Sequence, residues 1–171
     1  MNLDLACGQI KRLGFRGVDI VPGPGVDFIW DLEKYPWRPF KNNSIEEIYC
    51  SHYLEHVSDL IKFMDEVWRI CKNGAKVTFI SPYYTSIRAW QDPTHKHVIS
   101  EATFLYFDKD WRRTNKLDHY PIKSHFRVEQ TLFLFNQPWD KKPEKARAFA
   151  KDHYLNVVSD MIMVLRVVKL C

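Results

Sequence analysis

The stretch Leu3-Asp4-Leu5-Ala6-Cys7-Gly8 opens the chain, followed by Gly17-Val18-Asp19-Ile20 and then by Val26-Asp27-Phe28-Ile29-Trp30-Asp31-Leu32. Each stretch is a short apolar run that ends on or near an acid or a glycine. Apolar runs of this length predict buried strands. In an open α/β sheet, the carboxyl ends of neighbouring strands line the crevice in which ligands bind. The three runs therefore predict a ligand site at one edge of a sheet, built from the first residues of the chain.

Two residues in these runs indicate the kind of ligand. The carboxylate of Asp19 ends the second run and can accept hydrogen bonds from both hydroxyls of a ribose. Gly8 has no Cβ, so its backbone can approach a ligand closely. The alternative for Asp19 is a structural role in which it caps the turn at residues 21–25. Taken together, the residues favour an adenosine-containing cofactor.

Further segments continue the pattern: Asn42-Asn43-Ser44-Ile45-Glu46-Glu47-Ile48, Ser51-His52-Tyr53-Leu54-Glu55-His56-Val57 and Trp68-Arg69-Ile70-Cys71-Lys72-Asn73-Gly74. In order and spacing, these segments and the opening runs resemble the class I S-adenosylmethionine-dependent methyltransferases, in the small methyltransferase type 11-like branch. The resemblance covers residues 2–107 and, more loosely, the last strands. It implies S-adenosylmethionine as cofactor and a minimal Rossmann-like α/β fold. The sheet would be mostly parallel with an antiparallel last strand, and helices would cover both faces.

The hydrophobic pattern predicts the elements of this fold. Strands are expected at residues 2–6, 15–20, 26–31, 45–51, 75–81, 125–135 and 160–170. One helix is expected to begin with Ser58 as its N-cap and Asp59 in its first turn, and to end at Asn73-Gly74. A short helix follows Ser100, and another is expected at residues 143–156.

Two connections depart from the family pattern. A parallel crossover normally needs a dozen residues or more, usually with a helix. Residues 9–14 join the first two strands, and residues 21–25 join the next two. Neither link can hold a regular helix, so loops or single turns are expected there.

The resemblance also implies which residues bind the cofactor. The first turn would hold the methionine half, Asp19 the ribose, and Asp31 and Leu32 the adenine, while the loop at residues 51–57 would close over the cofactor. Asp31 could equally cap the turn at Glu33-Lys34. The cofactor-binding residues expected are Asp4, Ala6, Cys7, Gly8, Asp19, Ile20, Asp31, Leu32, Ser51, His52 and His56.

His52, Glu55 and His56 also match the H-x-x-E-H metal signature. That interpretation requires a helix, so that the two histidines share a face, and a third ligand further along the chain. The expected strand at residues 45–51 and the cap at Ser58 leave residues 51–57 as a loop. No metal ligand is therefore expected, and a zinc hydrolase is kept as an alternative.

The stretch Asp92-Pro93-Thr94-His95 lies in a long connection after the strand at residues 75–81. Long loops in compact domains are usually functional or mobile, and this one should leave the sheet at the cofactor edge. A histidine there could take a proton from a hydroxyl or an amine. His95 and Asp92 are therefore the candidate catalytic residues, together with Tyr83 in the acceptor pocket. Asp-Pro-Thr is also a turn sequence, in which His95 would only hold the loop.

The 171 residues predict a single domain, with a cofactor-binding half at residues 1–81 and an acceptor half at residues 82–171. The 4 cysteines form no C-x-x-C pair, which favours a reducing cytoplasm. No signal peptide and no membrane span are expected.

The formal net charge of +4 permits an anionic substrate without requiring a nucleic acid. Basic and aromatic residues alternate at residues 108–127, but acidic residues dilute their charge, so a solvated surface is expected there. We therefore expect methyl transfer to an oxygen or nitrogen of a small molecule, such as a sugar or an anionic metabolite. The alternatives are a methyltransferase acting on RNA or another macromolecule and a non-catalytic cofactor-binding module. A homodimer is compatible with the sequence.

Overall fold

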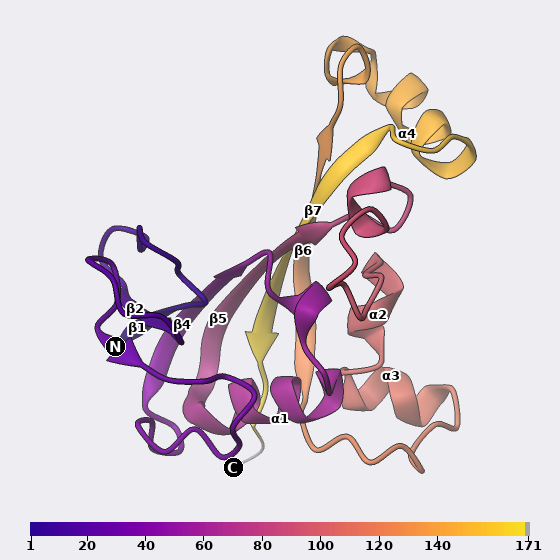
Figure 1. The fold of residues 1–171 in the computed structure, drawn as a ribbon. Coiled ribbons are helices and arrows are strands. Elements are labelled where there is room, and N and C mark those ends of the chain that lie inside the picture. The colour runs from indigo at the N-terminus through magenta and orange to yellow at the C-terminus, as the bar shows by residue number, and fades with distance from the viewer. Residues whose placement is uncertain (170–171) are drawn as a thin grey trace.

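The computed structural model describes residues 1–169, which form a seven-stranded sheet in the order β3-β2-β1-β4-β5-β7-β6 (Figure 1). The strands are β1 (Asn2–Leu5), β2 (Arg16–Asp19), β3 (Phe28–Ile29), β4 (Ile45–Ser51), β5 (Cys71–Pro82), β6 (Phe126–Phe135) and β7 (Val158–Val167). Strands β1 to β5 pair in parallel, whereas β7 is antiparallel to β5 and to β6. The predicted Rossmann-like sheet, mostly parallel with an antiparallel last strand, is confirmed. The strand expected at residues 160–170 lies at Val158–Val167, and residue 170 and Cys171 lie outside the described residues.

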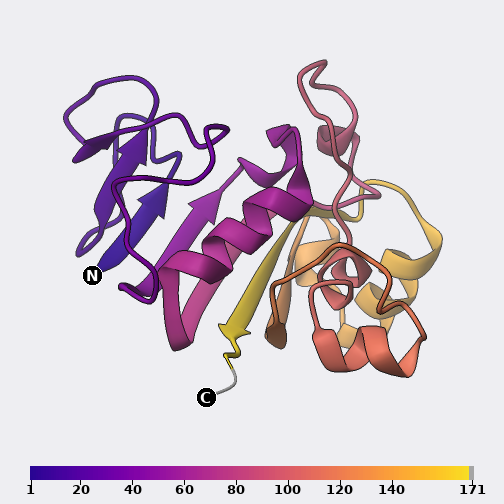
Figure 2. The same ribbon diagram turned by 90° about the horizontal axis from the view of Figure 1, so that it is seen from below.

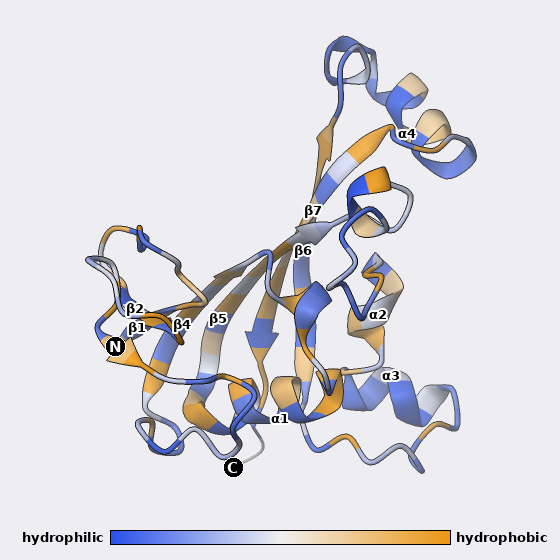
Figure 3. Cartoon of the chain, viewed as in Figure 1, coloured by the Kyte–Doolittle hydropathy of each residue, from blue (hydrophilic) through white to orange (hydrophobic). Residues whose placement is uncertain are grey.

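The helices are α1 (Leu60–Ile70), α2 (Glu101–Leu105), α3 (Lys109–Thr114) and α4 (Glu144–His153), and single 3₁₀ turns form η1 (Leu54–His56), η2 (Ile87–Ala89) and η3 (Trp139–Lys141). Figure 3 shows apolar residues gathered on the strands and on α1, whereas α3 is mainly hydrophilic. Within residues 1–169, no helix is long and apolar enough to cross a membrane.

Both predicted ends of α1 are wrong. The N-cap is Asp59 rather than Ser58, because the Asp59 side chain accepts a hydrogen bond from the Lys62 amide at 3.0 Å. The helix ends at Ile70, since Cys71 already has extended backbone and begins β5. Asn73-Gly74 therefore lies in an irregular start of β5, where Gly74 has a φ of +76°.

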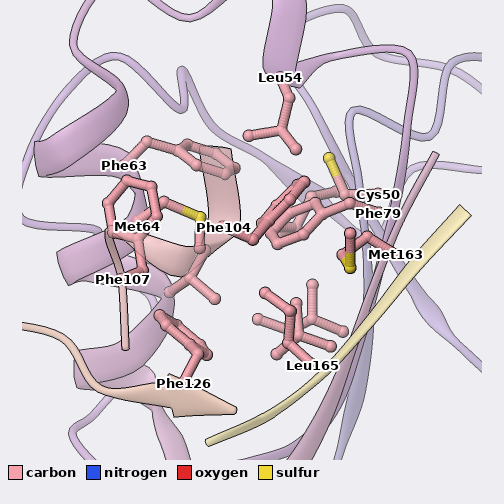
Figure 4. Packing of buried hydrophobic residues seen from close by; sticks show 14 of the residues in the cluster. Cys50, Leu54, Phe63, Met64, Phe79, Phe104, Phe107, Phe126, Met163 and Leu165 are labelled. Carbon is pink, nitrogen blue, oxygen red and sulfur yellow. The ribbon is translucent and has the colours of Figure 1, made fainter. Parts of the chain in front are cut away.

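The core lies on one face of the sheet. Phe79 of β5 is fully buried, and its ring centroid lies 6.2 Å from that of Phe63 on α1 and 5.9 Å from that of Phe104 on α2 (Figure 4). On the same face, Phe133 of β6 lies 5.1 Å from the ammonium of Lys151 on α4. Helices α1, α2 and α4 thus all pack on the face that carries Phe79.

The opposite face has no helix packed on it among residues 1–169, so the expectation of helices on both faces is wrong (Figure 2). The cause is the short links after β1 and β2, which cannot hold crossover helices. At the β1 side, the guanidinium of Arg12 lies 4.6 Å from the Tyr49 ring and covers part of this face. Further along, Ile80 and Ile162 are only half-buried, and Leu132 is 43% exposed.

This asymmetry predicts that substitutions at two adjacent residues of β5 lower the free energy of unfolding by different amounts. Phe79→Ala should lower the free energy of unfolding by about 3–5 kcal/mol, because it leaves a cavity in the packed face. Ile80→Ala, on the open face, should cost only about 1–2 kcal/mol, because less apolar area is lost from burial. Urea unfolding followed by circular dichroism measures both, and equal losses would contradict the one-sided core.

Candidate functional site

A cavity of about 370 Å³ lies at the carboxyl ends of the first strands, within the size range of small-molecule sites. It is lined by Ala6, Asp19, Ile20, Trp30, Asp31, Leu32, Glu33, Tyr53, His56 and Lys96. Of these, Ala6, Asp19, Ile20, Asp31, Leu32 and His56 were expected from the sequence. The structure therefore brings residues from the first turn, the ends of β2 and β3 and the turn η1 around one space.

The Asp19 carboxylate connects the end of β2 to the first turn. Its Oδ2 accepts a hydrogen bond from the Gly8 amide at 2.8 Å, and its Oδ1 accepts one from the Val21 amide at 3.0 Å. The bond from Val21 is the turn cap that the sequence left open as an alternative. Each carboxylate oxygen has a second lone pair, so Asp19 can hold both turns and still accept hydrogen bonds from a ligand.

The first turn has backbone in the left-handed region, with a φ of 53° at Ala6 and 60° at Gly8. Glycine adopts this conformation freely, whereas alanine does so at a cost of about 1–2 kcal/mol. A Cβ at Gly8 would have no atom within 4 Å, so the space over this residue is open. Backbone strain of this kind clusters at ligand sites, where the surrounding structure maintains it.

Asp4, Cys7 and Gly8, which were also expected at the cofactor, do not line the cavity. The side chains of Asp4 and Cys7 are engaged elsewhere. Asp4 is buried, where its Oδ2 accepts a hydrogen bond from the Arg12 amide at 2.7 Å, and burial raises the pKa of its carboxyl group. The Cys7 sulfur lies 3.6 Å from the Gly25 carbonyl oxygen, and burial raises the pKa of the thiol to about 11. Both side chains therefore contact the loops beside the first turn rather than the cavity.

Asp27 links the two short connections, a role that was not predicted from the sequence. Its carboxylate accepts hydrogen bonds from the Gly17 amide at 2.7 Å and from the Lys11 ammonium at 2.6 Å, and lies 3.1 Å from Arg16 Nε. These contacts, the bond from Lys11 first, lower the pKa of Asp27. Lys11 and Arg16 are distant from Asp27 in the sequence, so no local sequence pattern indicates these contacts.

Two aromatic residues form walls of the cavity and were also missed. Trp30 directly precedes Asp31, and its amide donates to the Asp19 carbonyl oxygen at 2.9 Å, which fixes its place beside β2. Burial, followed by the nearby Glu33, raises the pKa of the Tyr53 phenol, the second wall. Asp31 accepts a hydrogen bond from the Glu33 amide at 3.0 Å, so the turn cap expected as its alternative role is present.

Ser51 and His52 do not line the cavity. Ser51 is the last residue of β4, and His52 follows it with a φ of 54°. His52 Nδ1 lies 3.4 Å from Glu55 Oε1, and its Nε2 lies 3.9 Å from Asp160 Oδ1. The H-x-x-E-H residues occupy a loop and the single 3₁₀ turn η1, as the sequence predicted.

The loop after β5 brings Asp92 and His95 to the cavity wall at His56. The His56 and His95 rings lie 4.7 Å apart, and the Thr94 hydroxyl lies 3.0 Å from His56 Nδ1. The side chain and amide of Thr94 donate to Asp92 and lower the pKa of its carboxyl group. The amide of Lys96 donates to the Glu55 carbonyl oxygen at 2.7 Å and holds the loop against η1.

Tyr83 lies apart from this group. Its hydroxyl donates to Glu101 at 3.1 Å, and it lines a different cavity of about 440 Å³ with Lys151 and Glu101. Burial, followed by Glu101, raises the pKa of the Tyr83 phenol. The structure therefore does not bring Tyr83 together with His95.

Two arginines of the basic segment are engaged within the protein. Arg112 is buried and donates to the carbonyl oxygens of Tyr106 at 2.6 Å and Ile122 at 3.2 Å. Arg127 pairs with Asp110 at 3.0 Å. Lys109 and Lys123 line a cavity of about 450 Å³ with Arg69 and Lys169, at the opposite edge of the sheet from the candidate site.

A family model described as a methyltransferase domain matches residues 26–79. No curated protein matches the chain. Among solved structures, the YcgJ protein from Bacillus subtilis is 15% identical, with a TM-score of 0.60 over 99% of this chain and 92% of that chain. A SAM-dependent methyltransferase from Archaeoglobus fulgidus is 17% identical, with a TM-score of 0.59 over 96% and 85%. One from Mesorhizobium loti is 15% identical, with a TM-score of 0.58 over 96% and 89%.

The structural likeness shows the Rossmann-like fold of this class. The family match covers residues 26–79, which is less than half of the chain. The Rossmann-like fold predicted from the opening strands is confirmed.

The contacts of Asp27 predict a pH dependence of stability. Its pKa in the folded protein is below the ordinary value of 3.8, so its stabilising effect is complete above that value and is lost as the pH falls through the folded pKa. Asp27→Asn should therefore be less stable than the wild type at neutral pH. The difference should shrink as the pH falls from about 5 to about 2. Urea unfolding at several pH values measures it, and a constant difference would contradict the role of the charge.

Proposed function

We propose that the cavity at the carboxyl edge binds S-adenosylmethionine and that the protein transfers the methyl group to an oxygen or nitrogen of a small-molecule acceptor. The observation that carries the proposal is the convergence of Ala6, Asp19, Asp31 and His56 on one cavity. These residues come from separate segments, and each was expected at the cofactor before the fold was known.

The residues present fit this cofactor. The Asp19 carboxylate would accept hydrogen bonds from the ribose hydroxyls, and the open space at Gly8 would admit the methionine half beside the backbone. Asp31 and the Leu32 backbone would contact the adenine, between the side chains of Trp30 and Tyr53. When bound, S-adenosylmethionine supplies an electrophilic methyl carbon.

The remaining task of the protein is to align the acceptor, exclude water and remove a proton where needed. Alignment can contribute about 7–11 kcal/mol in favourable cases, and a positioned base can contribute about 10²–10⁴-fold. His95 is our candidate base. Its Nδ1 lies 3.1 Å from the Ala89 carbonyl oxygen, which can only accept a hydrogen bond, so Nε2 is left to take a proton. Asp92 would hold the loop that carries His95 in position beside the acceptor.

A small acceptor is favoured over a nucleic acid because two arginines of the basic segment are already engaged within the protein. Arg112 is buried among carbonyl oxygens, and Arg127 is paired with Asp110. Binding of a polyanion depends on cationic side chains that are free to contact phosphates. Tyr83 and its cavity stay a candidate acceptor region. The homodimer and the cytoplasmic location stay predictions.

Replacing Asp19 should weaken cofactor binding. Asp19→Ala should lower the affinity for S-adenosylmethionine by about 10–100-fold, because hydrogen bonds to a charged group contribute about 1.5–3 kcal/mol. Asp19→Asn, which keeps one acceptor oxygen, should lose less. Asp140→Ala, which removes a carboxylate from η3, should bind like the wild type. Isothermal titration with S-adenosylmethionine and S-adenosylhomocysteine measures these affinities.

Unfolding measurements on the same variants separate loss of the turn from loss of the ligand contact, because Asp19 also holds Gly8. Wild-type affinity in a folded Asp19→Ala variant would overturn the proposed ribose contact. Binding with no transfer of a labelled methyl group to any small acceptor would instead favour a non-catalytic module. Salt-sensitive RNA binding would favour a macromolecular acceptor.

A further inference from the structure

Glu55, His56 and His95 meet at the wall of the cofactor cavity. One donor atom of each residue lies within 4.8 Å of the donor atoms of the other two. Glu55 and His56 belong to η1, and His95 comes from the loop after β5. His56 also lines the candidate cofactor cavity, so the group lies directly beside it.

The Glu55 carboxylate is buried with one oxygen unpartnered. The residue is 2% exposed, its Oε1 lies 3.4 Å from His52 Nδ1, and its Oε2 has no hydrogen-bond partner. A buried carboxylate is costly unless it is paired or coordinates a metal ion. Glu55 therefore has an unpartnered, buried carboxylate oxygen, and one of its two oxygens lies within 4.8 Å of a ring nitrogen of each histidine.

The hydrogen bonds of both histidines place the ring proton on Nδ1, so that Nε2 carries the lone pair; His95 Nε2 lies 3.8 Å from Asp92 Oδ2. The Ala89 carbonyl oxygen can only accept, so His95 Nδ1 carries the proton. The Thr94 hydroxyl uses its one hydrogen on Asp92 Oδ1, at 2.7 Å, so it must accept from His56 Nδ1. A histidine that ligates a metal usually donates its other ring N–H to a carbonyl or a similar group. Both rings are held in that tautomer.

We propose that Glu55, His56 and His95 bind a divalent transition-metal ion, with Zn²⁺ as the best fit to the donor set. Two imidazoles and one carboxylate form a known three-residue zinc set that leaves one position open, with bonds of about 2.0–2.2 Å. An ion would draw the three donor atoms closer together. The sequence signature pairs His52 with His56 on a helix, whereas the fold supplies His95 as the second histidine.

The place of the ion suggests a role that rests on the proposed function. The open position would take a hydroxyl of the acceptor, and a bound metal lowers the pKa of such an oxygen. The hydroxyl proton would leave to solvent. The oxygen would then bond to the methyl carbon while the carbon–sulfur bond breaks, with its electron pair staying on sulfur. In this case His95 Nε2 would bind the ion, and His95 would not act as the base.

Metal titration of the untagged protein tests the site without cofactor or acceptor. After treatment with a chelator, the wild type should bind one equivalent of Zn²⁺ by isothermal titration. With Co²⁺ it should give the visible absorption of a low-coordinate site. His95→Ala and Glu55→Gln should abolish stoichiometric binding. Thr94→Val removes the hydroxyl that joins His56 to Asp92, while all three ligands remain, and should weaken binding by about 10–100-fold.

His119→Ala, at an exposed histidine outside the group, and His52→Ala should both keep one equivalent of bound metal. Circular dichroism checks that each variant is folded. If His95→Ala does not fold, the nearly isosteric Glu55→Gln variant provides the test. Absence of stoichiometric binding by the wild type, or wild-type binding by a folded His95→Ala, would overturn the proposal. Loss of binding in His52→Ala would also overturn this ligand set. Because no methyl transfer is measured, failure of the proposed function would leave these results unchanged.

Discussion

The hydrogen bond from the Gly8 amide to the Asp19 carboxylate is the interaction on which the site depends. It joins the end of β2 to the first turn, whose backbone is held in the left-handed region at Ala6 and Gly8. A parallel crossover usually contains a helix, which would pack behind such a turn. Here side-chain carboxylates fix the loops instead: Asp4 accepts a hydrogen bond from the Arg12 amide, and Asp27 accepts one from the Gly17 amide.

The same short links explain the one-sided core. Without helices after β1 and β2, the buried layer forms on the face of the sheet that carries α1, α2 and α4. The other face keeps half-buried aliphatic residues such as Ile80 and Ile162 in contact with solvent. The site is nevertheless complete at the carboxyl edge, because its residues come from strand ends and loops rather than from the missing helices.

The loop after β5 is part of the site because it is fastened to η1. The amides of Lys96 and His97 both donate to the Glu55 carbonyl oxygen, and Thr94 links Asp92 to His56. These bonds place a segment from the second half of the chain against the candidate cofactor cavity. The chemistry proposed for His95, whether it holds a proton or an ion, depends on this attachment.

The sequence by itself determined the fold class and much of the cavity. Short apolar runs that end on Asp19 and Asp31 specify parallel strands and the edge at which ligands bind, because both follow from local periodicity and strand direction. The link lengths also predicted that crossover helices would be missing after β1 and β2. The helices expected on both faces came from the resemblance instead, and the short links account for that error.

Only the tertiary structure decided which side chains meet. Trp30 and Tyr53 form walls, Asp27 joins two loops and His95 approaches Glu55, through contacts between residues distant in the chain. Tyr83 was separated from His95 for the same reason. Local patterns fix where a strand ends, but the packing of loops against one another fixes which polar atoms are left free at that edge.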